Sequence, residues 1–176
     1  SKDDYLDIEK QESIKSLIIA LWKKDDEEFK RPEYVALSLA INGYYEKLVQ
    51  NSALFPCFNT FYDYLKTDFA QQVAEDKVKD EHFDLDNLLY VLKPFYGKGE
   101  FGYLLNATEN LELLKERFIV FELDNLKDHP ILFPVVTIII METFISKMRK
   151  LNGVRKMILI EEAWKAIAKE GMAEYI

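Results

Sequence analysis

The chain has 176 residues, of which 49% are hydrophobic and 31% charged, and this is enough to bury one substantial core or two small ones. Its formal net charge of −8 argues against a dedicated nucleic-acid binder, because phosphate binding usually requires a basic surface. Cys57 is the single cysteine, so no internal disulfide can form, and we expect a buried structural thiol. The charged start is not typical of a signal peptide, and the most apolar stretch, 131–141, is too short to span a membrane.

The first hundred residues show the apolar spacing of amphipathic helices. Pro32 is well placed to open one of them, and Asn59 is a plausible N-cap for another. Gly43 weakens the second helix slightly, because glycine is a poor helix former. The dense aromatic side chains of this half are expected to form the core between the helices. The predicted helices cover 6–23, 32–50, 59–75 and 85–92.

The pattern changes after about Arg117. The apolar run 118–121 is continuous and partly β-branched, as expected for a strand that is covered on both faces. A helix over 130–150 should follow it, and the run 156–160 then reads as a second buried strand before another helical pattern to Ile176. The order strand, helix, strand, helix implies parallel strands joined by a right-handed crossover.

These patterns divide the chain into a helical domain, 1–116, and part of an α/β domain, 117–176. The predicted fold class is therefore α/β with a large helical part, in which the parallel strands cover 117–124 and 155–161.

Two adjacent carboxylates, Glu161 and Glu162, follow the second predicted strand directly. The carboxyl ends of parallel strands are where open α/β sheets bind their ligands. In nucleotide-hydrolysing motors one acid at this point holds magnesium, usually through water, and a neighbouring glutamate polarises the attacking water. Glu161 would take the first role and Glu162 the second. Spacing alone equally allows that both acids only stabilise the N-terminus of the following helix.

The run 157–164, which reads Met-Ile-Leu-Ile-Glu-Glu-Ala-Trp, resembles the Walker B segment of the conjugation and type IV secretion ATPases. It is most similar to the TraG type encoded by conjugative transposons, a VirB-family motor ATPase. The stretches 117–126, 130–134 and 103–106 also resemble that group. The specific part of the resemblance covers about 96–176, and the helical half resembles an insertion that this family carries within its motor domain.

The resemblance implies an all-α insertion domain followed by part of a RecA-like P-loop NTPase core, in an oligomeric ATPase that energises conjugative DNA transfer or type IV secretion. It implies ATP and Mg²⁺ as cofactors, with Glu162 as the catalytic residue and Glu161 on the metal through water. Glu161 stands where the family's pattern prefers aspartate. The implied partners are other channel components and further copies of the protein, without sequence-specific nucleic-acid binding. The implied location is the cytoplasmic face of the bacterial inner membrane, where the complex provides peripheral membrane association.

The phosphate-binding loop G-x-x-x-x-G-K-[ST], or Walker A motif, does not occur in the 176 residues. We therefore expect this chain alone neither to bind nor to hydrolyse ATP appreciably, because the amides and lysine that hold the phosphates are missing. The segment 97–102 formally spells G-x-G-x-x-G, but a helical segment precedes it where a dinucleotide site would need a strand. A connecting loop is the expected role of this segment.

Two alternatives to a motor remain at this point. The chain could be a non-enzymatic helical interaction module for secretion-channel partners. A metal-dependent nuclease would need Asp124 beside Glu161 and Glu162. A basic cluster could also contact nucleic acid or anionic lipid, although three of its members belong to a predicted helix C-terminus, where cations complement the dipole. The cluster consists of Lys147, Arg149, Lys150, Arg155 and Lys156.

Overall fold

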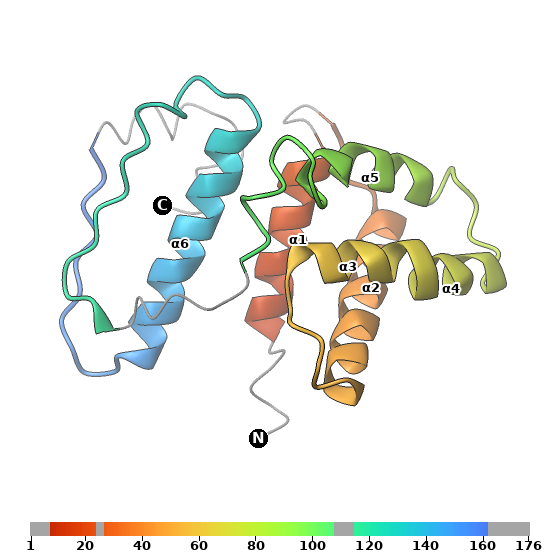
Figure 1. Ribbon diagram of the computed structural model, residues 1–176, viewed down its shortest axis with the longest axis horizontal. Helices are drawn as coiled ribbons and strands as arrows, with labels where there is room; N and C mark the ends of the chain where they lie inside the picture. The colour runs from red at the N-terminus through yellow and green to blue at the C-terminus, as the bar shows by residue number, and fades with distance from the viewer. Residues whose placement is uncertain (1–7, 24–26, 108–114, 162–176) are drawn as a thin grey trace. The chain divides into compact units, whose positions relative to one another are not determined.

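The computed structural model describes residues 8–23, 27–107 and 115–161. The chain divides into two compact units, Ser1–Asn110 and Leu111–Ile176, and the regular elements of both are helices (Figure 1). The first unit contains α1 (Ile8–Trp22), α2 (Arg31–Gln50), α3 (Phe58–Tyr64), the π-helical turn η2 (Leu65–Phe69), α4 (Ala70–Glu75), α5 (Leu85–Leu92) and the 3₁₀ turn η3 (Lys93–Phe95), and the second contains α6 (Leu132–Lys150).

The predicted α/β class is wrong for the part of the chain that the structure describes, because that part contains no β-strand. The expected parallel strands over 117–124 and 155–161 are irregular segments, so the RecA-like core is not seen. Both run in the same direction along the second unit (Figure 1), and their apolar side chains lie in solvent, with Phe118 84% and Met157 87% exposed.

The prediction of strands failed because an apolar pattern describes one segment and not its pairing partner. A continuous apolar run indicates that a segment favours extension and burial, but a strand also needs a neighbouring backbone for its N–H and C=O groups. Within the described residues, the backbone amides of 118–121 and 157–160 donate to no backbone or side-chain acceptor. The pattern therefore identified extended segments without identifying a partner for either of them.

The helices, in contrast, begin and end close to the predicted positions. The predicted third helix is confirmed as one continuous helical stretch, although the π-helical turn η2 interrupts its α-helical hydrogen bonding. The N-cap prediction is wrong, because Cys57 occupies that position and Asn59 lies inside the first turn. The N–H of Cys57 is instead satisfied by the hydroxyl of Thr60 at 3.2 Å.

Aromatic side chains form much of the core of the first unit, as predicted. Phe83 packs edge-on against both Trp22 and Phe69, with ring centroids 5.8 and 6.1 Å apart. The indole N–H of Trp22 donates to Asn87 at 2.8 Å, so the buried ring of α1 also has a polar partner in α5. The fully buried aliphatic side chains of this unit include Leu37, Ile41, Leu65, Leu88 and Leu92.

A buried ion pair joins the end of α1 to the start of α2. Lys23 Nζ lies 2.8 Å from Glu33 Oε1, and the other carboxylate oxygen of Glu33 accepts the N–H of Lys30 at 2.9 Å. Both oxygens of this buried carboxylate are therefore satisfied, which buried charges require.

The second unit is built on α6. His129 Nδ1 accepts the N–H of Leu132 at 3.1 Å and so caps the first turn of the helix. At the other end, Lys147 Nζ donates to the backbone carbonyl of Glu116, which holds the segment before 118 against the last turn. In the described part of the chain no helix is both long and apolar enough to cross a membrane.

Candidate functional site

The structure describes Glu161, the first acid of the predicted site, but not Glu162, the second. Glu161 is exposed and lies in a turn at the end of the segment 155–161. Glu162 and the tryptophan that follows it, Trp164, lie outside the described residues. The structure therefore shows a solvent-accessible carboxylate at the first position, and the role of the second rests on the sequence.

The described residues do not bring metal-ligating side chains together. No group of three or more His, Cys, Asp or Glu side chains is arranged there to hold a metal ion. Asp124, which a nuclease site would need beside Glu161, is exposed and has Lys127 as its partner at 3.7 Å. His82 lies on the surface 3.7 Å from Glu81.

The glycine-rich segment 97–102 is a tightly folded connecting loop. Gly97 has a φ of +58°, a backbone conformation that residues with a side chain rarely adopt. A Cβ atom on Gly99 would lie 2.3 Å from the carbonyl oxygen of Pro94, and one on Gly102 would lie 2.2 Å from that of Gly97. The glycines are therefore explained by close backbone contacts within the loop.

The N–H groups of the three glycines in this loop are already engaged. The N–H of Gly97 donates to the side chain of Asn59 at 2.8 Å, and those of Gly99 and Gly102 donate at 2.9 Å to the carbonyls of Tyr96 and Gly99. A phosphate-binding loop works through amides that point at the ligand. The three glycine N–H groups donate to Asn59 and to carbonyls of the loop itself, so none of the three is available to a phosphate.

Asn106 fastens the loop to the first turn of α3. Its side-chain oxygen accepts the N–H of Asn59 at 2.6 Å, and its Nδ2 donates to the carbonyls of Phe95 at 2.9 Å and Gly102 at 2.7 Å. In the sequence, the motif 103–106 stands out only through its resemblance to a family. Its structural role could have been suspected from an amide side chain that follows a glycine-rich turn.

A pair of stacked tyrosines lies next to this junction. The rings of Tyr62 and Tyr96 are 4.4 Å apart, and the Tyr96 hydroxyl donates to Asp63 at 2.7 Å. That hydrogen bond to a carboxylate raises the pKa of Tyr96. Lys66 Nζ lies about equally far from both ring centroids, at 6.0 and 5.8 Å. A shallow depression nearby is lined by Tyr90, Val91, Lys93, Pro94, Gly99 and Glu100.

The geometry alone does not identify a family for this chain, and a comparison with known proteins does. The family model of the TraG P-loop domain matches residues 1–176. No curated protein and no solved structure matches the chain.

Proposed function

Because this chain belongs to the TraG P-loop domain family and is thus related to the conjugation P-loop ATPases, we propose that it forms part of the motor for conjugative DNA transfer or type IV secretion. The match over 1–176 is the observation that carries the proposal, and it confirms the resemblance read from the run 157–164. A P-loop family binds nucleotides in general, and ATP is the nucleotide that we propose.

Within this motor we assign Glu161 to the metal and Glu162 to the attacking water. A carboxylate oxygen is a ligand that suits Mg²⁺, and the exposure of Glu161 leaves room for the waters that this ion retains. Mg²⁺ would neutralise charge on the phosphates during transfer. Glu162 would accept a hydrogen bond from the attacking water and orient it.

The proposed setting is a complex at the cytoplasmic face of the bacterial inner membrane. Its other members would be channel components and further copies of the motor. The acidic net charge of −8 supports a protein partner over a sequence-specific nucleic-acid site.

A second candidate function is a helical interaction module for channel components. The observation that favours it is a set of exposed apolar side chains on α2, namely Val35 at 49%, Leu39 at 45% and Val49 at 45% exposure. Exposed apolar side chains that gather on one element can mark a surface that packs against another protein. In this case the two glutamates would carry no chemistry.

Magnesium-dependent ATP hydrolysis separates the two functions. The 176 residues contain no Walker A motif, so the assay needs a protein in which this chain occurs together with such a loop. We expect Glu162→Gln to reduce turnover by at least about a hundredfold while nucleotide binding is retained. Glu100→Gln, an exposed glutamate of the first unit, is the matched control and should leave turnover unchanged. Turnover that survives Glu162→Gln would favour the interaction module.

A further inference from the structure

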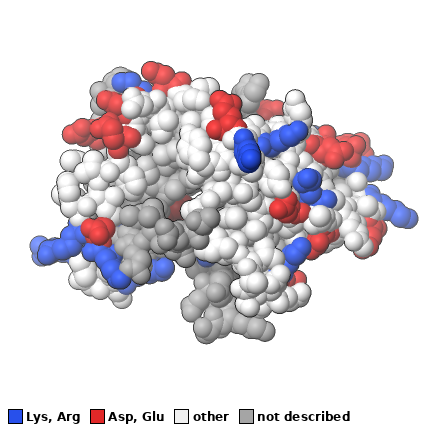
Figure 2. Space-filling view, viewed as in Figure 1, with Lys and Arg blue, Asp and Glu red and all other residues white. Residues whose placement is uncertain are grey.

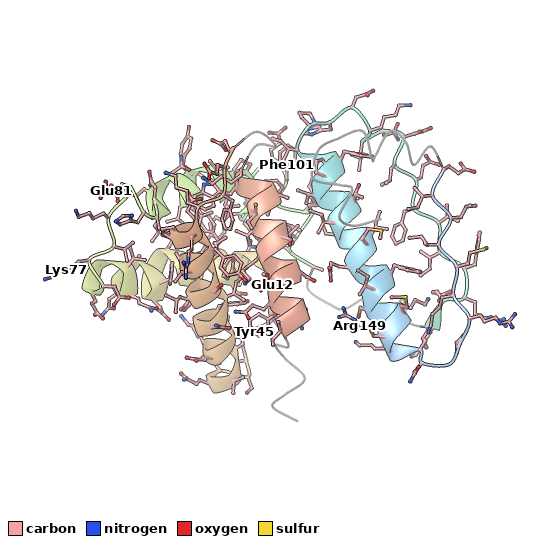
Figure 3. All side chains as sticks on the ribbon, turned by 180° about the vertical axis from the view of Figure 1, so that it is seen from behind. Glu12, Tyr45, Lys77, Glu81, Phe101 and Arg149 are labelled. Atoms are coloured by element: carbon pink, nitrogen blue, oxygen red, sulfur yellow. The ribbon has the colours of Figure 1, made fainter. Side chains whose placement is uncertain are left out.

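Basic side chains gather at one end of the second unit, the end at which α6 finishes. Three segments contribute to this basic end: 115–117, the last turn of α6, and 155–156. The hydrogen bond from Lys147 to the carbonyl of Glu116 holds the first two together, and a short turn connects α6 to the third. Figure 2 shows the Lys and Arg atoms at this end, and Figure 3 labels Arg149 there. The members of the basic end are Lys115, Arg117, Lys147, Arg149, Lys150, Arg155 and Lys156.

The helix dipole does not account for this concentration of charge. Lys147, Arg149 and Lys150 lie in the last turn of α6, where they complement the dipole. The other four basic residues lie outside the helix and gain nothing from it. Glu116 is the single acidic residue in the three segments. A strongly positive surface on a chain of net charge −8 therefore calls for another explanation.

Four of the seven cations of this surface are available to a partner. Among the described residues, no ion pair involves Arg117, Lys150, Arg155 or Lys156. Acidic residues of the same unit, including Asp124 and Asp128, lie in the segment that leads into the opposite end of α6. This separation of charge would turn the basic end toward an anionic surface and the acidic end away from it.

Apolar side chains lie between the cations. Met148 is 44% exposed, Val154 58% and Met157 87%, and each is next to a basic residue in the sequence. Alternation of cations with exposed apolar side chains is typical of surfaces that enter the head-group region of a bilayer, where the cations bind phosphates and the apolar groups leave water. A single-strand binding surface would instead offer several aromatic rings for base stacking, and among the described residues Phe118 is the one aromatic residue next to one of these cations in the sequence.

We propose that the basic end binds the anionic head groups of a phospholipid bilayer, with Met148 and Val154 inserted between them. This contact goes beyond the proposed function, because it requires neither nucleotide nor another channel component. It would give the second unit a direct attachment to the membrane surface.

Co-sedimentation of the 176-residue chain with lipid vesicles tests the proposal without nucleotide. We expect binding to vesicles of equimolar phosphatidylglycerol and phosphatidylcholine at about 0.15 M salt, and none to pure phosphatidylcholine. Lys150→Gln with Arg155→Gln should weaken binding about thirtyfold, since each cation near an anionic surface contributes about 1 kcal/mol. Lys93→Gln with Lys98→Gln removes the same charge from the first unit and should have no effect. Val154→Asn should weaken binding without a change in charge.

Three outcomes would overturn the proposal. The first is equal binding to both kinds of vesicle, and the second is equal loss of binding in the two double variants. The third is that the chain binds a single-stranded oligonucleotide, as measured by fluorescence anisotropy, at a salt concentration at which it does not bind the vesicles. If a variant loses its helical circular dichroism signal, a salt titration of the unmodified chain tests the proposal instead. The chain should dissociate from the anionic vesicles as the salt concentration rises, because salt screens the attraction between the cations and the head groups. Failure of this test would leave the ATPase assignment unaffected, because hydrolysis is measured separately.

Discussion

The hydroxyl oxygen of Tyr64 lies directly over Gly43, at 2.1 Å from the position that a Cβ atom would occupy on this glycine. Tyr64 belongs to α3 and is buried, and Gly43 lies in the middle of α2. A glycine inside a helix normally costs stability. Here the missing side chain makes room for the tyrosine ring, so the two helices can approach closely.

We predict that Gly43→Ala lowers the free energy of unfolding by about 1–2 kcal/mol, because overpacking costs about 1–3 kcal/mol and the gain in helix propensity offsets up to about 1 kcal/mol of it. Urea denaturation measures the change. In a Tyr64→Phe background the hydroxyl is absent and the next ring atom is 3.2 Å from the Cβ position, so the cost should become much smaller. Equal costs in both backgrounds would contradict this account of the contact.

The Asn106 side chain offers a second test, because it makes three hydrogen bonds that no other residue type reproduces. We predict that Asn106→Ala destabilises the first unit by about 2–3 kcal/mol, since it leaves part-buried backbone groups of the loop unsatisfied. Asn106→Asp keeps the acceptor and loses the donors, so it should also be destabilising. Asn152→Ala, at an exposed position of the second unit, is the control and should change the unfolding free energy by less than about 0.5 kcal/mol.

The helices of the first unit could be predicted because their signals are local. Apolar spacing and Pro32 lie within the segments that they describe, and α2 begins one residue before this proline. Asn59 shows where local reasoning fails, since its side chain binds Gly97, 38 residues away, and does not cap its own helix. A cap signal and a tertiary hydrogen bond use the same side-chain atoms, so the sequence cannot distinguish them.

The predicted strands failed for a related reason. Whether 118–121 becomes a strand depends on a backbone elsewhere, and the apolar pattern contains no information about that partner. The acid pair is a different case, because its position after a predicted strand suggested it and a family resemblance added support, while Glu162 lies outside the described residues. Its role stays a prediction for the hydrolysis assay.

Glu12 should make the stability of the first unit depend on pH. The hydrogen bond from Lys15, at 2.5 Å, together with one from Tyr34, holds the pKa of Glu12 below its ordinary value of 4.5. A carboxyl whose folded pKa is lowered contributes stability above the unfolded value, and this contribution is lost as the pH falls from 4.5 through the folded value.

We predict that Glu12→Gln removes this part of the acid sensitivity. The effect should be a few tenths of a kcal/mol, because the side chain is 47% exposed and solvent screens the interaction. Urea denaturation at pH values above and below 4.5 measures it, with Glu100→Gln as the exposed control. A variant that loses as much stability in acid as the unmodified chain would show that Glu12 is not responsible.

The final prediction concerns the start of α6, where His129 Nδ1 accepts the N–H of Leu132 at 3.1 Å. The first amides of a helix have no partner within it, so loss of this acceptor leaves one of them unsatisfied. His129→Ala should therefore destabilise the second unit by about 1 kcal/mol, the usual cost of removing an N-terminal cap, and increase hydrogen exchange at Leu132. His129→Asn offers a side-chain oxygen in the same region, and asparagine is a favoured cap, so most of the protection should return. If alanine and asparagine gave the same exchange rate, the imidazole would act through its packing and not as a hydrogen-bond acceptor.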